Sequence, residues 1–374
     1  MADGSAPTGS GVEVDPQPTR PHASGARAGA VREPGAGTGA RRPPTIEDVA
    51  RAAGVGRGTV SRVLNGSVQV SPAARAAVRR AVDELGYVPN RAARSLVTRR
   101  TDTVALVVSE PGDRLFGDPY FAAILRGIGE RLADSPYQLL LTMTATSRDR
   151  ERVAAYLTDQ HADGVLLLSL HAHDDLAARL ETRGVPTVCG GRPATTHPAC
   201  VVDVANRVGA RSAVDHLLHR GRRHVALVAG PQDMSSGHDR LLGAQDAWVG
   251  AGLPTEHLLV VHGDYSEASG EVGVRELVAR GHHPDAVFAA SDLMAVGAMR
   301  ALRAAGLRVP EDVAVVGFDD SPVCRHTEPE LTTVRQPVVE MGRVMADLLV
   351  TRMVGGEVPA ETVLPTQLVV RASS

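Results

Sequence analysis

The sequence predicts an α/β chain in which a small helical module precedes a larger body built from parallel β-sheets. Two patterns indicate this. Residues 45–86 carry three successive sets of helix start and stop signals, and from Thr103 onward short apolar runs alternate with longer helical stretches. The length of 374 residues and the 43% hydrophobic content allow two or three domains with substantial cores.

Residues 1–44 are rich in Gly, Ala, Pro, Ser and Thr and contain almost no large apolar side chain. Such a segment cannot bury enough surface to offset its chain entropy, so we expect a disordered tail. The sequence contains no apolar run of spanning length and no secretion signal, which favours a cytoplasmic protein. The three cysteines, Cys189, Cys200 and Cys324, show no paired spacing and are predicted to be free, buried thiols.

Three short helices are predicted in the first module, over residues 45–53, 57–64 and 72–85. The first opens with Thr45-Ile-Glu-Asp48, a capping box in which hydroxyl and carboxylate satisfy free backbone amides. The third opens with Ser71-Pro72, an N-cap followed by a proline at the first helical position. Glycines between and after the helices terminate them.

The body is predicted to contain continuous apolar strands, the pattern of buried parallel sheets with right-handed βαβ crossovers. Because these strands are numerous, two sheets are expected, with a first crossing between Asp203 and Asn206. Helices are predicted over residues 205–219 and 292–305. The predicted strands cover residues 104–108, 165–168, 225–229, 287–290 and 313–316.

Charge is segregated along the chain. Residues 45–101 hold ten Arg and four acidic residues, a net charge of +6, whereas the whole chain carries −3. All 40 basic residues are Arg, so the arginine count alone says little, but its distribution indicates a polyanion partner for the first module.

A tight glycine-containing turn between the first two helices is typical of a helix-turn-helix, which presents its second helix to the DNA major groove. Helix count and charge alone leave a purely structural trihelical module equally open. Specific residues favour DNA binding. The stretch from Thr45 to Gly66, followed by Val70-Ser71 and by residues 85–96, resembles the DNA-binding head of the LacI/GalR family of transcriptional regulators.

By this resemblance, Arg57, Gly58 and Arg62 occupy the recognition-helix positions that face base edges. Arginine can donate two hydrogen bonds to guanine, and phosphate-only contact is the alternative. Phosphate contacts and helix packing are implied for a second set, Thr45, Thr59, Ser61 and Asn65. Two departures from the family pattern stand out, because glycine occupies position 56, where a serine usually caps the helix, and position 58, where a side chain usually reads a base.

Residues 90–97 resemble the family's hinge helix, which completes a predicted DNA-binding domain over residues 45–100. Leu96 is the implied wedge between central base pairs in the minor groove, since an apolar wedge unstacks and kinks the duplex. Asn90, Arg91 and Arg94 are the implied DNA contacts beside it. The alternative is an interdomain linker with no role on DNA.

The resemblance continues over residues 103–370, where the family carries a two-lobed core like that of periplasmic sugar-binding proteins. The implied effector-binding and dimerisation domain covers residues 101–374. Lobe 1 is expected at about 103–203 plus 337–364, and lobe 2 at about 204–335 plus 365–374. Such a core binds its ligand between lobes, at the carboxyl ends of parallel strands.

Effector contacts follow from the same resemblance, which implies a small molecule of the sugar class. Arg240, Ser291, Asp319 and Gln336 would face the ligand, and Tyr265 would stack on a sugar ring. For Arg240 and Asp319 a lobe-bridging or helix-capping contact is the alternative, and for Tyr265 a core position. Further implied contacts are Tyr120 and Phe121, near Asp118, and Arg192, although the acid usual in the family near position 191 is replaced by glycine.

Asp292 and Asp320 are assigned structural roles, the first in capping the following helix and the second in fixing a loop. Enzymatic function is disfavoured, because the chain lacks a phosphate-binding G-x-x-x-x-G-K loop and a G-x-S-x-G nucleophile elbow. Two histidine pairs have a spacing that could bind a metal, but no further ligands lie near them in the sequence, so surface histidines are predicted: His171 with His173, and His216 with His219. No catalytic residue, metal or cofactor is expected.

These observations predict a repressor whose affinity for a pseudo-palindromic operator is controlled by a sugar. The absence of leucine heptads after residue 371 favours a homodimer over a tetramer. Two alternatives remain open, a regulator that requires the ligand as corepressor and a small-molecule binding protein that acts through protein contacts.

Overall fold

The computed structural model describes residues 42–64, 66, 69–88, 100–159, 161–172, 174–193 and 198–374. They belong to two compact units, one ending at Pro89 and one beginning at Asn90, which we call the head and the body. The predicted tail, apart from residues 42–44, and the predicted hinge helix lie outside the described residues, as do Asn65 and His173.

The head contains the three predicted helices, α1 (Ile46–Ala53), α2 (Arg57–Leu64) and α3 (Pro72–Leu85). The capping box predicted for α1 is present, since the Thr45 hydroxyl accepts from the backbone of Asp48 and the Asp48 carboxylate accepts from the backbone of Thr45. Gly54 ends α1 with φ 65°, a left-handed conformation that glycine adopts without steric cost. One inward residue from each helix forms the centre of the core: Val49, Val60 and Val78.

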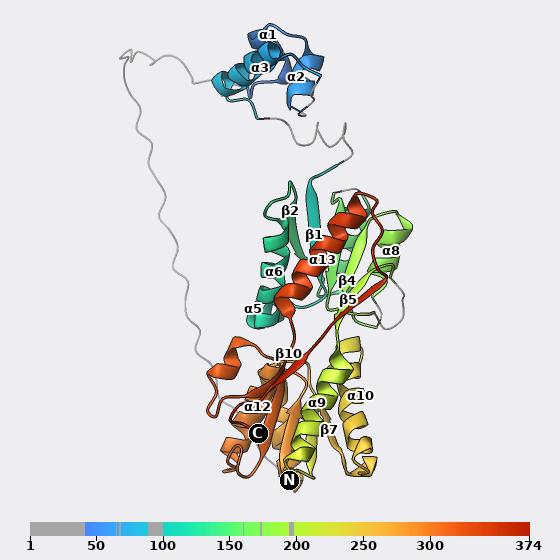
Figure 1. Cartoon of the computed structure of the whole chain (residues 1–374), viewed down its shortest axis with the longest axis vertical. Helices are drawn as coiled ribbons and strands as arrows, with labels where there is room; N and C mark the ends of the chain where they lie inside the picture. The colour runs from blue at the N-terminus through green and yellow to red at the C-terminus, as the bar shows by residue number, and fades with distance from the viewer. Residues whose placement is uncertain are drawn as a thin grey trace, which may run out of the picture. The chain divides into compact units, whose positions relative to one another are not determined.

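The body consists of two six-stranded sheets with helices on both faces, which confirms the predicted α/β class (Figure 1). We call the first sheet and its helices lobe 1 and the second lobe 2. The first sheet has the order β11-β5-β4-β3-β1-β2 and the second β12-β10-β9-β8-β6-β7. Neighbouring strands are parallel except for β10 and β12, which are antiparallel.

In lobe 1 the strands are β1 (Thr103–Val108), β2 (Gln138–Met143), β3 (Gly164–Leu168), β4 (Thr187–Gly190), β5 (Val201–Val204) and β11 (Glu361–Leu364). Its helices are α5 (Gly112–Gly117), α6 (Pro119–Leu132), α7 (Ser147–Thr158), α8 (Leu176–Thr182) and α13 (Val338–Met353). Successive residues of β1 point to opposite faces, so Leu106 packs with α6 and α13 whereas Val107 packs with α7 and α8.

In lobe 2 the strands are β6 (Val225–Ala229), β7 (Leu259–His262), β8 (Ala286–Ala289), β9 (Ala314–Asp319), β10 (Thr332–Arg335) and β12 (Gln367–Val369). Its α-helices are α9 (Asn206–His219), α10 (Ser235–Gly250), α11 (Glu267–Ala279) and α12 (Asp292–Ala304), with short 3₁₀ turns at Thr255–His257 and Pro322–Arg325. Helices α9 and α10 cover one face and α11 and α12 the other.

The chain passes between the lobes at three places, between β5 and α9, between β10 and α13, and between β11 and β12. The three cysteines are free and buried, as predicted. Within the described part of the chain, no helix is both long and apolar enough to cross a membrane.

Candidate functional site

A cavity lies where the two lobes meet, at the carboxyl ends of the parallel strands. Both lobes contribute to its walls, largely through residues that follow buried strands or lie in the first turns of helices. Seven of the eight residues expected to contact an effector line it, all except Arg192. The expected residues in the wall are Tyr120, Phe121, Arg240, Tyr265, Ser291, Asp319 and Gln336.

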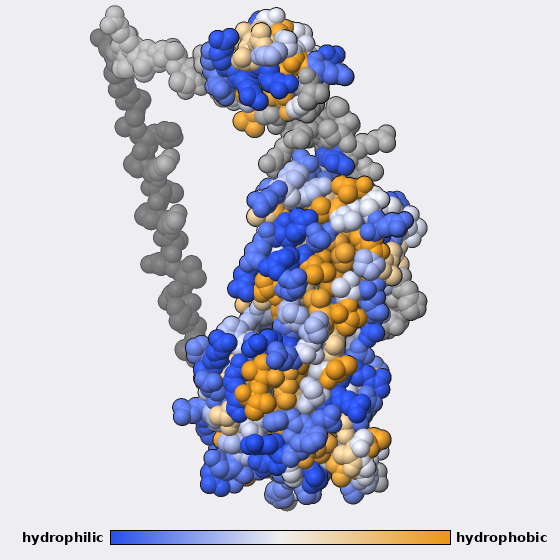
Figure 2. All heavy atoms as spheres, in the orientation of Figure 1, coloured by the Kyte–Doolittle hydropathy of each residue, from blue (hydrophilic) through white to orange (hydrophobic). Residues whose placement is uncertain are grey.

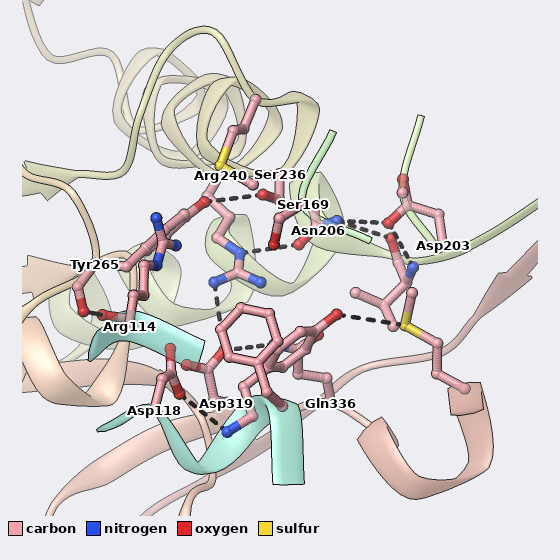
Figure 3. Close-up of a pocket in the computed structure, with 17 residues that line it drawn as sticks. Arg114, Asp118, Ser169, Asp203, Asn206, Ser236, Arg240, Tyr265, Asp319 and Gln336 are labelled. Carbon is pink, nitrogen blue, oxygen red and sulfur yellow. Dashed lines mark hydrogen bonds and ion pairs between the residues drawn. The ribbon is translucent and has the colours of Figure 1, made fainter. Parts of the chain in front are cut away.

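The guanidinium of Arg240 lies at the centre of this cavity (Figure 3). Its Nε donates to Asn206 Oδ1 at 2.9 Å, and Nη1 donates to the Ala290 carbonyl at 2.6 Å. The same Nη1 lies 3.4 Å from Asp319 Oδ1, and the guanidinium carbon lies 3.8 Å from the centre of the Phe318 ring. These partners all belong to lobe 2, so the lobe-bridging alternative for Arg240 does not apply.

Asp319 ends β9 and points its carboxyl group at Arg240. Burial raises the pKa of Asp319 well above its ordinary value, although the charge of Arg240 opposes that rise. Gln336, which follows β10 and is 5% exposed, donates a short hydrogen bond to Asp319 Oδ1. The two side chains therefore form a positioned donor and acceptor set that fits the hydroxyls of a sugar.

Tyr265 is held on several sides. Its hydroxyl pairs with Ser236 Oγ at 2.9 Å, and the guanidiniums of Arg114 and Arg240 lie 5.1 and 5.7 Å from its ring centre. Its φ is +70°, and Ser169 and Asp319 in the same wall also have positive φ. Strained backbone of this kind clusters at functional sites, where surrounding contacts hold it in place.

Lobe 1 contributes the start of α6 and the Arg114 side chain. Asp118 caps α6, because its Oδ1 accepts from the Tyr120 amide at 2.9 Å, and burial raises the pKa of Asp118. Tyr120 stacks edge-on against Phe121 with ring centres 5.3 Å apart. Phe121 is 2% exposed, so it supports the wall mainly as a core residue.

Asp203 and Asn206 lie at the junction of β5 and α9. The Asp203 carboxylate accepts from the Asn206 side chain at 2.9 Å, and Asn206 in turn accepts from Arg240. Burial raises the pKa of Asp203 to about 6. The wall thus holds three carboxyl groups of raised pKa, those of Asp118, Asp203 and Asp319.

Arg192 lies beside the cavity rather than in its wall. It donates a short hydrogen bond to Asp239 of lobe 2, and its Nε lies 3.7 Å from Asp203 Oδ2. Gly191, at the position where the family often carries an acid, has φ +90° and does line the cavity.

The capping role predicted for Asp292 is wrong. Ser291 is the N-cap of α12, because its Oγ accepts from the Met294 amide at 3.2 Å. Asp292 stands in the first turn, where its carboxylate accepts from the Ser321 amide and the Thr333 hydroxyl. A carboxylate one residue inside the helix reaches the neighbouring loop and strand instead of its own free amides.

Asp320 does fix its loop. It pairs with Arg335 at 2.6 Å and with Arg371 through a short contact. Asp320 therefore ties the end of β9 to β10 and to the C-terminal segment.

Five further residues line the cavity that were not predicted as site residues from the sequence: Arg114, Ser169, Asp203, Asn206 and Ser236. Asp118, which the sequence placed beside the implied contacts Tyr120 and Phe121, lines it as well. One signal was available, since Ser169, Asp203 and Asn206 are polar residues at or directly after buried strands of one parallel sheet. Arg114 and Ser236 gave no such signal. Their helices approach the site only through tertiary packing.

In the head, α2 presents a polar face opposite its core residue Val60. Arg57, Gly58 and Arg62 are exposed, whereas Thr59 and Ser61 are half-buried. Arg57 Nη1 lies 3.3 Å from Glu47, and the Thr45 hydroxyl is engaged in the α1 capping box. The expected contacts Asn65, Asn90, Arg91, Arg94 and Leu96 lie outside the described residues.

No group of metal-binding side chains is present among the described residues. His171 instead contacts Asp233 and Glu110, and His216 pairs with Ser374.

Two family models match the chain. Residues 45–90 match the model described as "Bacterial regulatory proteins, lacI family", and residues 214–374 match a periplasmic binding protein-like domain. The HTH-type transcriptional regulator CelR of Thermobifida fusca is 54% identical over 336 residues, which cover 89% of this chain and 99% of the relative. The chain belongs to the LacI family.

Solved structures of related regulators support this family assignment. A CelR–cellobiose complex, 51% identical, superimposes with a TM-score of 0.71 and covers 88% of this chain and all of its own. The Lac repressor dimer bound to operator and the anti-inducer ONPF, 29% identical, gives a TM-score of 0.79 over 89% of this chain and 99% of its own. This LacI-family chain is a DNA-binding transcriptional regulator with a periplasmic-binding-protein-like body.

Proposed function

We propose that this LacI-family regulator binds a glucose disaccharide of the cellobiose type between its lobes, and that the sugar controls its affinity for an operator. The central observation is the Arg240 guanidinium at the lobe junction, with the carboxyl groups of Asp118, Asp203 and Asp319 in the same wall. Carboxyls and an arginine with fixed orientation suit sugar hydroxyls, and the Tyr265 ring supplies an apolar face. The similarity to CelR, solved with cellobiose, supports the choice of sugar.

The seven expected residues of the wall are proposed as effector contacts, together with Asp118, Asp203 and Ser236. Arg192 is proposed to act from beside the cavity. Titration calorimetry with cellobiose, glucose and galactose tests this. Gln336→Leu should weaken cellobiose binding at least tenfold, because Asp319 then loses a donor inside the site.

Asp246→Asn is the control for that substitution, because Asp246 pairs with Arg207 on the outer face of lobe 2. It should leave the affinity for cellobiose unchanged. Absence of any heat with cellobiose, for a protein that still binds DNA, would contradict the proposed effector.

For the head, we propose direct reading of base edges by Arg57 and Arg62 on the exposed face of α2. Thr45, Thr59, Ser61 and Asn65 are proposed to contact phosphates or pack the helices, and Gly58 leaves a base unread. Selection from a random DNA pool at stated salt should enrich a pseudo-palindrome. Arg57→Ala should relax its outer bases at a cost of about 1–3 kcal/mol per base pair, whereas Arg152→Ala, on the exposed surface of α7, should not.

The hinge proposal rests on the family resemblance of residues 90–97. Asn90, Arg91 and Arg94 are proposed to contact the DNA, and Leu96 to enter the central base step. Leu96→Ala should relax the preference at that step without altering the outer bases. Unchanged selection at the centre would contradict it.

A homodimer is proposed as the working form, as in the Lac repressor structure. Figure 2 shows apolar surface on lobe 1 over the part that α13 crosses in Figure 1. Half-buried Val344 and Leu348 lie on that helix, and β2, at the sheet edge, carries half-buried leucines. Light scattering should give twice the chain mass of 39.2 kDa, and a stable tetramer would contradict the dimer.

We propose that the protein acts in the cytoplasm, without catalysis, as a repressor released by its sugar. Corepression is the second candidate. Fluorescence anisotropy of the selected operator distinguishes them, since added cellobiose lowers DNA affinity in the first case and raises it in the second.

A further inference from the structure

Two cations of lobe 1 reach across the cleft to carboxylates of lobe 2. His171, which follows β3, places Nδ1 2.7 Å from Asp233 Oδ2. Arg192, which follows β4, donates a short hydrogen bond to Asp239. Both carboxylates belong to one stretch of lobe 2, residues 233–239, at the start of α10.

The same stretch, together with the next residue, Arg240, forms part of the cavity wall. Met234, Ser236 and Arg240 line the cavity, and Ser236 also holds the Tyr265 hydroxyl. Residues that contact the other lobe therefore alternate with residues that shape the effector site, on less than three turns of chain. Any movement of this stretch relative to lobe 1 changes both sets of contacts together.

Each cation is also held by carboxylates of its own lobe. Glu110 is 3% exposed and lies 3.8 Å from His171 Nε2 and 2.9 Å from Arg114 Nη1. Arg192 stands 3.7 Å from Asp203 and 3.8 Å from Glu361. Lobe 1 therefore keeps both cations oriented toward the cleft, so that closure requires only the approach of residues 233–239.

We propose that His171–Asp233 and Arg192–Asp239 form a closure latch that positions the start of α10, and so sets how tightly the effector is bound. This inference rests on the proposed effector site between the lobes. His171, Arg192, Asp233 and Asp239 are positioning residues, since they act through Ser236 and Arg240. A ligand that binds only the closed form has an apparent affinity equal to its intrinsic affinity multiplied by the fraction of molecules that are closed.

The latch has a defined pH dependence. The carboxylates of Glu110 and Asp233 beside the ring raise the pKa of His171 to about 9, against the opposing effect of burial. Arg114 pairs with the same Glu110 carboxylate, so Glu110 is shared between a guanidinium and the imidazole. His171 is thus cationic at neutral pH and loses its attraction for Asp233 as the pH rises through about 9.

The first test measures the distance between lobes without any sugar. Spin labels at Ala155→Cys on α7 and Val249→Cys on α10 report it, since both positions are exposed and the natural cysteines are buried. Asp233→Asn with Asp239→Asn should add a population at longer distance in double electron–electron resonance. Asp246→Asn removes the same charge from α10 but pairs within lobe 2, so it should leave the distribution unchanged. An unchanged distribution in the double variant would overturn the latch.

The second test measures cellobiose affinity by calorimetry from pH 7 to 10. Each single variant should bind about two- to fivefold more weakly at pH 7, the range of a partly exposed ion pair. The affinity of the unmodified chain and of Asp246→Asn should fall as the pH passes about 9, and that of Asp233→Asn should change less. Equal pH profiles would overturn the role of His171. If neither the unmodified protein nor any variant binds cellobiose, but the distance between the lobes still lengthens in the double variant, the effector proposal is wrong and the latch is retained.

Discussion

Replacing Arg240 by Met tests directly whether the buried contacts of this guanidinium hold the cavity wall together. Methionine matches the length of the arginine stem but supplies no donor, so Asn206 Oδ1, the Ala290 carbonyl and the Asp319 carboxyl each lose a partner. Arg240 is 5% exposed, so water cannot readily replace those bonds. Removing one member of a buried ion pair costs about 3–5 kcal/mol of unfolding free energy.

Protonation of Asp319 limits that cost. The charge of Arg240 lowers the pKa of Asp319 against the effect of burial, so the pKa rises further in the variant. A raised pKa means that the folded state holds the proton more tightly than the unfolded state. Stability is then fully present below the unfolded pKa of about 4 and is lost as the pH rises through the folded value. The variant should therefore lose more stability at pH 8 than at pH 5.

The matched control is Arg207→Met. Arg207 also pairs with an aspartate in lobe 2, at 2.6 Å from Asp246, but it is 54% exposed. An exposed pair contributes at most about 1 kcal/mol. Urea unfolding followed by the fluorescence of Trp248, the single tryptophan and fully buried in lobe 2, measures both variants. If Arg240→Met lowers the free energy of unfolding no more than Arg207→Met does at pH 8, the buried ion pair does not have the stabilising role assigned to it.

Four further predictions concern stability and reactivity. Gly58→Ala should raise the melting temperature of the head and its free energy of unfolding by about 1 kcal/mol, because a Cβ there meets open space. Gly243→Ala should lower the free energy of unfolding of the body by about 1–3 kcal/mol, because its Cβ would lie 2.0 Å from the Arg207 carbonyl oxygen. Because the pKa of Asp203 is raised to about 6, the unmodified chain should lose up to about 3 kcal/mol of unfolding free energy as the pH rises from 4 through 6 to 8. Asp203→Asn should abolish this loss, and urea titrations at pH 4 and pH 8 measure it. The three cysteines should react with a thiol reagent only after unfolding, because burial removes access and raises their pKa values; rapid labelling of the native protein would contradict their placement.

Local signals in the sequence were sufficient for the head. The capping box at Thr45, the Ser71-Pro72 start and the glycines at 54 and 86 predicted the helices to within one residue of the bounds that the structure shows. Capping and glycine conformation depend on neighbours within four residues, so no tertiary information was needed. The buried strands β1, β3, β6, β8 and β9 were predicted for a similar reason, since strands covered on both faces are continuously apolar.

The edge strands β11 and β12 showed no such continuous apolar pattern. β11 and β12 are three or four residues long and partly exposed, and they pair with strands more than thirty residues away in sequence. Asp292 shows the same limit at a single residue. Its sequence position fits a helix cap, but its partners Ser321 and Thr333 come from a loop and a strand that only the folded lobe brings near.

The family resemblance pointed to seven residues of the cavity wall, including Arg240, Asp319 and Gln336. The sequence alone was sufficient to predict a LacI-type head followed by parallel α/β units, because hydrophobic period, caps and motif spacing are properties of short segments. The convergence of the polar side chains, and the contacts of Arg192 and His171 with lobe 2 beside the cavity, became visible only in the folded chain. Those contacts join residues more than 40 positions apart, and their geometry depends on how two lobes pack against each other.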